Sequence, residues 1–224
     1  YATDIAKKND RLTIGNLDLK PEKNDYFSLS AEYVHERFSV SVNAFYNNIR
    51  DMIDYNTIAT GDKAMEQYGH KEVRQRDNIA EAKVHGINVS ANAYLGAGFN
   101  LSGGYTHLNT QDVELEQPID KSIKNAYNIN AQWAHSWKIY RLNINLNGRI
   151  NSKRFSKSYG YAPEYQLWNL NTRHSFNLKS IIIEPGCGIE NLFDYTDDRP
   201  YNSNYATLTP GRSFYISLSL KFKS

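Results

Sequence analysis

The sequence is short of cysteine, of net charge and of long apolar runs, and each shortage excludes a class of protein. Its 224 residues include one cysteine, Cys187, so neither a disulfide framework nor a thiolate metal cluster can form within the chain. The formal net charge of +2 provides no basic excess, so we expect no nucleic-acid partner. No stretch approaches the roughly 18 consecutive apolar residues of a membrane-spanning helix. Membrane-spanning strands are not excluded, because they alternate apolar with polar residues and are polar on average.

Motifs of catalytic and metal sites are also missing. The six histidines include no HExxH and no pair at helical spacing, and no G-x-S-x-G marks a nucleophile. We therefore expect no catalytic residue, no metal site and no cofactor, and the sequence disfavours an enzyme.

Period-2 alternation of apolar and polar residues dominates the chain. In the last segment Phe214, Ile216 and Leu218 alternate with Tyr215 and Ser217, and ten such residues suffice for a tilted strand to cross the hydrocarbon layer. Nine segments follow this pattern: 27–33, 38–47, 87–95, 99–106, 127–133, 140–150, 165–176, 181–190 and 213–222. Pro185 interrupts the eighth, which predicts a bulge or an unpaired position there. Since no 3.6-residue period persists for three turns, the sequence predicts an all-β, antiparallel up-and-down fold.

The connections between these segments alternate between long and short. Long polar connections lie near 51–77, 109–123, 154–164 and 194–210, and short ones at 35–37, 95–98, 135–137 and 177–180. All the long loops therefore lie at one end of the sheet and the short turns at the other, as in outer-membrane barrels with external loops and periplasmic turns. This orientation predicts a periplasmic C-terminus at Ser224.

The composition of the polar face favours a wet barrel interior. It carries mainly Asn, Ser, Gln and Thr rather than the Lys and Glu of a soluble sheet. Aromatic residues gather near strand ends, as in the girdles at the two membrane interfaces: Tyr26, Tyr33, Trp133, Trp137, Tyr140 and Tyr215. The alternative is a soluble barrel or sandwich whose aromatic residues fill its core.

Four stretches resemble motifs of TonB-dependent outer-membrane receptors. They are residues 15–22 (GNLDLKPE), 78–88 (NIAEAKVHGIN, with Asn88 where Glu is usual), 189–194 (IENLFD) and 210–212 (PGR). The resemblance implies a 22-stranded transmembrane β-barrel, of which residues 1–224 are the C-terminal segment. The plug domain and the earlier strands are expected elsewhere, since the chain starts at Tyr1 without a signal sequence and an odd number of strands leaves open edges. The family usually ends on an aromatic residue, whereas here Lys223 and Ser224 follow Phe222.

The resemblance further implies active transport across the outer membrane. The expected ligand is a scarce nutrient complex, namely a ferric siderophore, haem, cobalamin, or a glycan or peptide. The expected partners are outer-membrane lipid, the TonB–ExbB–ExbD system acting through the plug, and a possible surface lipoprotein. The alternative is a passive porin or an adhesin barrel.

The external loops are the expected ligand-binding surface, because they combine aromatic rings with nearby cations. The candidate residues are Tyr68, His70, Arg74, Arg76, Tyr159, Tyr161 and Tyr201. Tyrosine is also common in barrel loops for structural reasons, and the two interpretations remain open. Cys187 falls on the apolar face of its strand, where a small packing or lipid-facing residue is expected.

Overall fold

The computed structural model describes residues 6–8, 10–197 and 209–223. It contains thirteen strands and one helix over these residues, in the order β1 (Ala6–Lys8), β2 (Arg11–Ile14), β3 (Lys23–His35), β4 (Phe38–Thr60), α1 (Gly61–Tyr68), β5 (Glu72–Gly96), β6 (Phe99–Asp112), β7 (Asn125–Ser136), β8 (Tyr140–Asn151), β9 (Arg154–Ser156), β10 (Gly160–Ala162), β11 (Tyr165–Asn177), β12 (Ile181–Glu190) and β13 (Ser213–Phe222). All nine predicted segments are strands, and the all-β prediction is confirmed. The chain divides into two compact units, which we describe separately.

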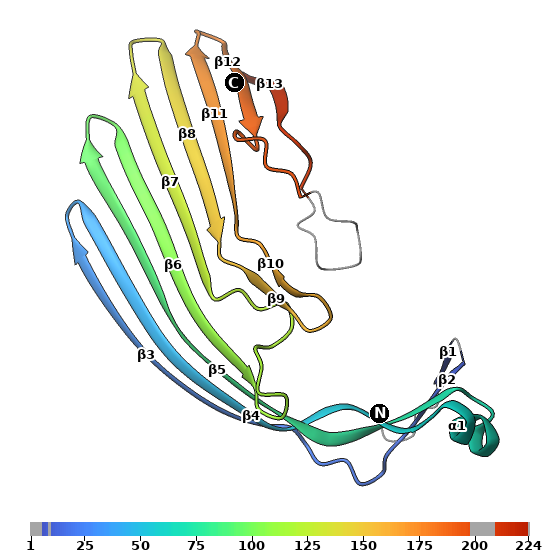
Figure 1. Cartoon of the computed structure of the whole chain (residues 1–224). Helices are drawn as coiled ribbons and strands as arrows, with labels where there is room; N and C mark the ends of the chain where they lie inside the picture. Colours follow the sequence, from blue (N-terminus) through green and yellow to red (C-terminus); the bar gives the residue numbers. More distant parts are fainter. Residues whose placement is uncertain (1–5, 9, 198–208, 224) are drawn as a thin grey trace. The chain divides into compact units, whose positions relative to one another are not determined.

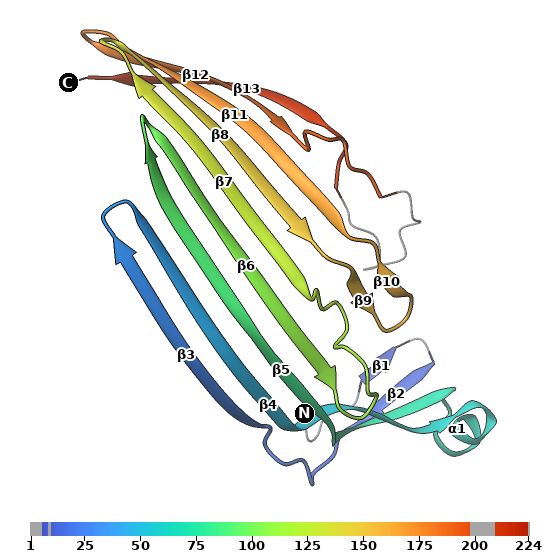
Figure 2. The ribbon, with the colours of Figure 1, turned by 60° about the vertical axis from the view of Figure 1, so that its left-hand side comes forward.

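Unit 2 consists of residues 28–45, 86–109 and 120–224 and is a single sheet. Neighbouring strands pair in the order β3, β4, β5, β6, β7, β8, β11, β12 and β13, as Figures 1 and 2 show. The connections β3–β4, β5–β6, β7–β8 and β11–β12 are short and lie together at one end of this sheet. The predicted separation of short turns from longer connections is therefore confirmed within this unit.

The strand register sorts side chains into an apolar and a polar face. Because partners in an antiparallel pair share a face, Phe99 opposite Trp133 and Leu101 opposite Ala131 lie on the apolar face. Asn130 opposite Asn147 lies on the polar face, where the Asn130 amide donates to the Asn147 carbonyl oxygen at 2.5 Å. Cys187 pairs with Ile216 on the apolar face, as predicted.

No second layer covers the apolar face of this sheet. The only buried apolar residues in the described part of the chain are four: Ala64, Val73, Ala82 and Ala162. By contrast, the side chain of Ile216 is 88% exposed and that of Phe222 is 80% exposed. The predicted alternative of a soluble sandwich with an aromatic core does not fit this arrangement. No helix among the described residues is both long and apolar enough to cross a membrane.

Several strands have features that the sequence indicates only in part. Among the described strands, β3 pairs only with β4 and β13 only with β12, so both are edges. At Pro185 the pairing of β12 with β11 is interrupted, but the register on both sides of the gap is the same. Pro185 therefore leaves unpaired positions rather than a bulge, and β12 stays continuously paired with β13.

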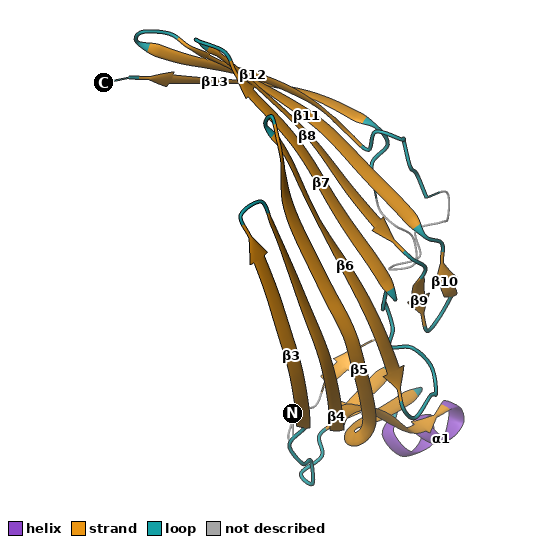
Figure 3. Cartoon of the chain, turned by 90° about the vertical axis from the view of Figure 1, so that its left-hand side faces the viewer, coloured by secondary structure: helices purple, strands orange, loops and turns teal. Residues whose placement is uncertain are grey.

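Unit 1 consists of residues 1–27, 46–85 and 110–119 and carries the continuation of β4 and β5. The prediction of an irregular loop at 51–77 is wrong. Instead, β4 runs to Thr60, α1 follows, and β5 starts at Glu72 (Figure 3). The N–H of Gly61 donates to the carbonyl of Lys71 at 2.8 Å, which joins the two strands at the base of α1. β2 pairs with β5 in parallel, the one parallel pair among the described strand pairings.

The helix α1 has local reasons to start and stop where it does. Asp62 lies in its first turn, where a negative charge is favourable to the helix dipole. Gly69 ends it in the left-handed conformation, with φ of 69°, and its N–H donates to the carbonyl of Met65. Eight residues make about two turns, too few for a helical period to be detected in the sequence.

Candidate ligand-binding surface

The candidates of unit 1 lie on the β4–β5 hairpin and the helix that joins its strands. Tyr68 is the last residue of α1, and His70 lies between α1 and β5; both are half-buried. Arg74 and Arg76 are two residues apart on β5, so their side chains leave the same face of the strand.

Arg74 and Arg76 converge on Tyr55 of β4. The guanidinium carbon of Arg76 lies 4.7 Å from the centre of the Tyr55 ring, and its Nη2 donates to the Tyr55 hydroxyl at 2.9 Å. The guanidinium of Arg74 lies 5.8 Å from the same ring. The ring face and the two cations form a surface on which a planar anionic group can stack. Tyr55 was not among the predicted site residues, although it lies in the segment that the sequence assigned to binding.

Glu72 holds this part of the hairpin to β2. Its two carboxylate oxygens accept hydrogen bonds from Arg74 and from Arg11, the second at 2.8 Å. These bonds hold the pKa of the Glu72 carboxyl below its usual value, and the bond from Arg74 has the largest effect. Burial acts in the opposite direction and has a smaller effect. Arg74 is therefore partly neutralised by the Glu72 carboxylate.

The candidates of unit 2 lie on a small hairpin formed by β9 and β10. Tyr159 lies in its turn and Tyr161 on β10, and both rings are exposed. The Tyr161 ring packs edge-on against Phe155, with ring centres 5.4 Å apart. Backbone hydrogen bonds between Phe155 and residues 121 and 122 hold this hairpin against the preceding connection. Tyr201 lies outside the described residues.

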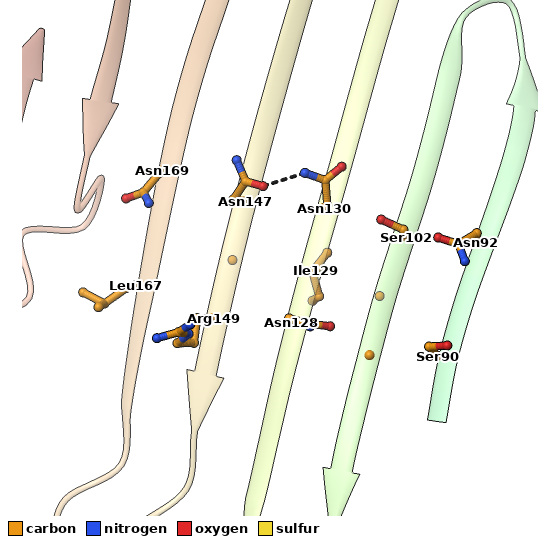
Figure 4. Close-up of a pocket in the computed structure, with 13 residues that line it drawn as sticks. Ser90, Asn92, Ser102, Asn128, Ile129, Asn130, Asn147, Arg149, Leu167 and Asn169 are labelled. Carbon is orange, nitrogen blue, oxygen red and sulfur yellow. Dashed lines mark hydrogen bonds between the residues drawn. The ribbon is translucent and has the colours of Figure 1, made fainter. Parts of the chain in front are cut away.

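A polar hollow on the polar face of β5–β11 was not predicted from the sequence. It has a volume of about 650 Å³ and is lined by amide and hydroxyl side chains from five strands, as Figure 4 shows: Ser90, Asn92, Ser102, Asn128, Asn130, Asn147, Arg149 and Asn169. A second hollow of about 610 Å³ shares Ser90, Asn128 and Arg149 with the first.

Arg149 is the only charged residue that lines either hollow. It is exposed and forms no ion pair with any residue that the structure describes. Asn128 lies directly opposite it on β7 and offers a neighbouring amide. A guanidinium surrounded by neutral donors and acceptors is suited to a carboxylate, phenolate or other planar anion. The signal in the sequence was a lone arginine among Asn and Ser near the end of an alternating segment.

The arrangement offers no site for a resident metal. Within the described ranges, no three His, Cys, Asp or Glu side chains come together as metal ligands do. The groups that line the candidate surfaces are aromatic rings, amides and guanidinium cations.

A single-layer sheet with an uncovered apolar face, a polar face of amides and short turns at one end is the wall of a membrane β-barrel. The model of the family described as "TonB dependent receptor-like, beta-barrel" matches residues 5–192. The chain belongs to this family, as the four sequence motifs indicated.

Several proteins similar to this chain are siderophore receptors by name, and one similar solved structure is the copper transporter OprC. The probable TonB-dependent siderophore receptor PiuA of Acinetobacter baumannii is 28% identical over 163 residues, which cover 65% of this chain and 21% of that protein. The chain thus spans about a fifth of the length of this relative.

Solved structures confirm the fold. The siderophore receptor PirA from Acinetobacter baumannii matches with a TM-score of 0.70 and 19% identity over 95% of this chain and 33% of that one. The ferric enterobactin receptor PfeA in complex with BCV-L6 matches with a TM-score of 0.71 and 21% identity over 94% and 33%. BauA, the ferric preacinetobactin receptor from Acinetobacter baumannii, matches with a TM-score of 0.67 and 18% identity over 90% and 30%.

Proposed function

We propose that residues 1–224 are the C-terminal barrel segment of an outer-membrane receptor that binds a ferric siderophore and imports it with energy from TonB. The named relatives support this ligand class over haem, cobalamin or a glycan. The plug and the earlier barrel strands lie in the remainder of the receptor, and TonB–ExbB–ExbD acts through that plug.

The observation that carries the proposal is the unpaired Arg149 in a hollow that contains no acidic side chain. Ferric siderophores present planar oxygen donors that carry negative charge, and a guanidinium binds such groups bidentately. In a barrel, the polar face lines the lumen, so the hollow lies on the route of the ligand. The Arg76–Tyr55 pair on β5 and β4 of unit 1 provides a similar combination of cation and ring.

The orientation follows from the connections. Outer-membrane barrels place short turns in the periplasm, so we propose that the turns 36–37, 97–98, 137–139 and 178–180 are periplasmic and that the C-terminus is periplasmic too. The β4–β5 extension and the β9–β10 hairpin, which lie at the long connections, are then external.

The test is uptake of radioactive iron by cells that depend on the whole receptor. A panel of catecholate, hydroxamate and carboxylate siderophores is loaded with iron and supplied to cells with and without TonB. We expect uptake of one class, abolished without TonB. TonB-independent uptake would instead indicate a passive porin.

A charge variant tests the hollow directly. Arg149→Gln removes a charge-assisted hydrogen bond worth about 1.5–3 kcal/mol, so binding of the transported siderophore weakens by about tenfold or more. Arg141→Gln is the matched control, because Arg141 lies on the same face of the same strand but lines neither hollow. Equal effects of the two variants would contradict a role for the hollow.

A further inference from the structure

An apolar groove runs along the apolar face of unit 2. One hollow is lined by side chains of β5–β11: Leu95, Phe99, Leu101, Ala131, Trp133, Ile144, Leu146 and Leu170. A second hollow on the same face shares Leu101 with the first and is bounded by Ala91, Gly103, Tyr105 and Tyr127. Small residues, such as Ala131 in the first hollow and Gly103 in the second, lie between the larger ones, so the groove is continuous past Leu101.

The length of this groove matches one leaflet of a bilayer. From Phe99 to Tyr105 there are six residue steps, about 20 Å along the strand. With a strand tilt of about 40°, this corresponds to a depth of roughly 15 Å, which is half of the hydrocarbon thickness of about 30 Å. An extended acyl chain of one phospholipid therefore fits its length.

The groove ends at a cluster of amphipathic rings beside the β7–β8 turn. Trp133 belongs to both the groove and the cluster of rings. The centre of its ring lies 5.9 Å from that of Phe99 and 6.5 Å from that of Trp137. Tyr140 continues the cluster, with its ring stacked 5.3 Å from that of Trp137. Such rings mark the level of the lipid headgroups.

Two hydrogen-bond donors without a partner among the described residues lie next to each other beside this cluster of rings. The indole N–H of Trp133 is taken by the carbonyl of Ala97 at 3.1 Å, but that of Trp137 has no hydrogen bond within the described chain, and its side chain is 48% exposed. The neighbouring Lys138 is exposed and makes no ion pair with a described residue. An indole N–H and an ammonium group on adjacent residues of a tight turn match the oxygens of a phosphate.

The charge at this end of unit 2 is predominantly positive. The four short connections and the last described residue carry the cations Arg37, Lys138, Lys179 and Lys223 against the single acid Glu36. Clusters of this kind attract anionic lipid headgroups.

We infer that this groove is a specific site for an anionic phospholipid, with one acyl chain between Trp133 and Tyr105 and the headgroup phosphate on Trp137 and Lys138. The site is independent of the proposed siderophore transport, and it faces the leaflet at the short-turn end of the barrel. Its occupant shields the exposed ring of Phe99 and the half-buried ring of Trp133, and anchors the wall at a fixed depth.

The test is native mass spectrometry of the whole receptor titrated with phosphatidylglycerol or phosphatidylcholine of the same acyl chains. We expect saturable binding of phosphatidylglycerol and weaker binding of phosphatidylcholine. Lys138→Gln is expected to weaken phosphatidylglycerol binding by about fivefold, the effect of one lysine at an anionic surface. Trp137→Phe, which keeps the ring and removes the donor, is expected to act in the same direction.

Matched controls separate a site from general surface charge. Lys179→Gln removes the same charge from another turn at the same end, and Ala44→Phe adds a ring to the apolar face outside the groove, whereas Ala131→Phe fills the groove. Loss of the bound lipid in Ala131→Phe, with both controls close to wild type, supports the site. Equal losses in Lys138→Gln and Lys179→Gln, no effect of Ala131→Phe, or equal binding of the two lipids would each overturn it.

Discussion

The strongest test of how the β4–β5 hairpin of unit 1 is held concerns Asn78. Its side-chain oxygen accepts the N–H of Lys20 at 2.7 Å, and its amide donates to the carbonyls of Lys20 at 2.9 Å and of Asp51 at 2.6 Å. Three segments distant in sequence thus meet on one side chain. Asn78→Ala removes all three bonds.

The expected magnitude follows from the number of bonds. Each is partly exposed, so water replaces part of the loss and about 1 kcal/mol per bond is a fair scale. The sum of about 3 kcal/mol corresponds to local opening roughly 150-fold more often. Hydrogen exchange of the peptide amides of residues 17–25, measured by mass spectrometry on the whole receptor, should accelerate by this factor.

The matched control is Asn16→Ala, in the same segment. Asn16 accepts one local bond, from the N–H of Asp18 at 2.9 Å, so its loss should accelerate exchange less than tenfold. Asn78→Asp keeps the acceptor but sets a carboxylate against two carbonyls, and should open the segment at least as often as Asn78→Ala. If hydrogen exchange in Asn78→Ala is no faster than in Asn16→Ala, the role of Asn78 in holding these segments together is refuted.

Three further perturbations follow from named contacts. Because the pKa of Glu72 is lowered in the folded chain, its ionised form stabilises the β2–β5 pairing above the unfolded pKa of about 4.3, and this contribution is lost as the pH falls through the lowered value. Hydrogen exchange of residues 11–14 should therefore accelerate, relative to the intrinsic rate, below about pH 4, and Glu72→Gln should remove that pH dependence. A Cβ at Gly86 would lie 2.2 Å from the backbone oxygen of His107. Gly86→Ala should therefore lower the free energy of unfolding in a urea titration by about 1–3 kcal/mol or more. Gly103→Ala is the control and should cost less, because a Cβ there would lie 3.2 Å from its nearest neighbour. Trp168 covers Gly148, where a Cβ would lie 2.5 Å from its ring, and Trp168→Ala should lower the heat resistance of the folded barrel, whereas Trp168→Phe should restore most of it.

Period-2 alternation predicted the strands wherever one face meets lipid and the other water. It failed beyond residue 50 of β4 and before residue 87 of β5, although both strands continue there. Charged residues such as Asp51, Asp54 and Arg74 occur there without alternation, while the backbone of both strands remains in the sheet. The short strands β9 and β10 escaped prediction because three residues show no period.

The candidate site was predicted as a region and resolved as contacts only in the structure. The loop composition pointed to Arg74 and Arg76, but only the pairing of β4 with β5 brings both onto Tyr55. The alternation of residues 140–150 places Arg149 on the polar face, yet its isolation depends on which neighbours the register provides. Whether the Arg149 side chain has an acidic neighbour depends on residues of β7, β8 and β11 together. No single segment of the sequence therefore shows it.

The family motifs gain a physical meaning from where their side chains point. Asn191 is 5% exposed, with φ of 52°, and its amide reaches the carbonyls of Tyr195 and Pro210; Asp194, with φ of 56°, accepts the N–H of Arg212 at 2.6 Å. The motifs at 189–194 and 210–212 thus close the base of one long connection.

The motifs at 15–22 and 78–88 act in the same way at the base of the β4–β5 hairpin of unit 1. Asn78 binds the backbone of Lys20, and the carboxylate of Glu22 accepts the N–H of Ile53 at 2.8 Å. Left-handed conformations, which Asn and Asp tolerate better than most residues, occur at Asn191 and Asp194 in the first place and at Asp51, outside the motifs, in the second. In both places side chains bind the neighbouring backbone. The motifs therefore specify how strands leave the membrane and where connections begin. The proposed ligand contacts Arg76 and Arg149 both lie outside the four motifs, so a match to the motifs establishes the family and leaves the ligand open.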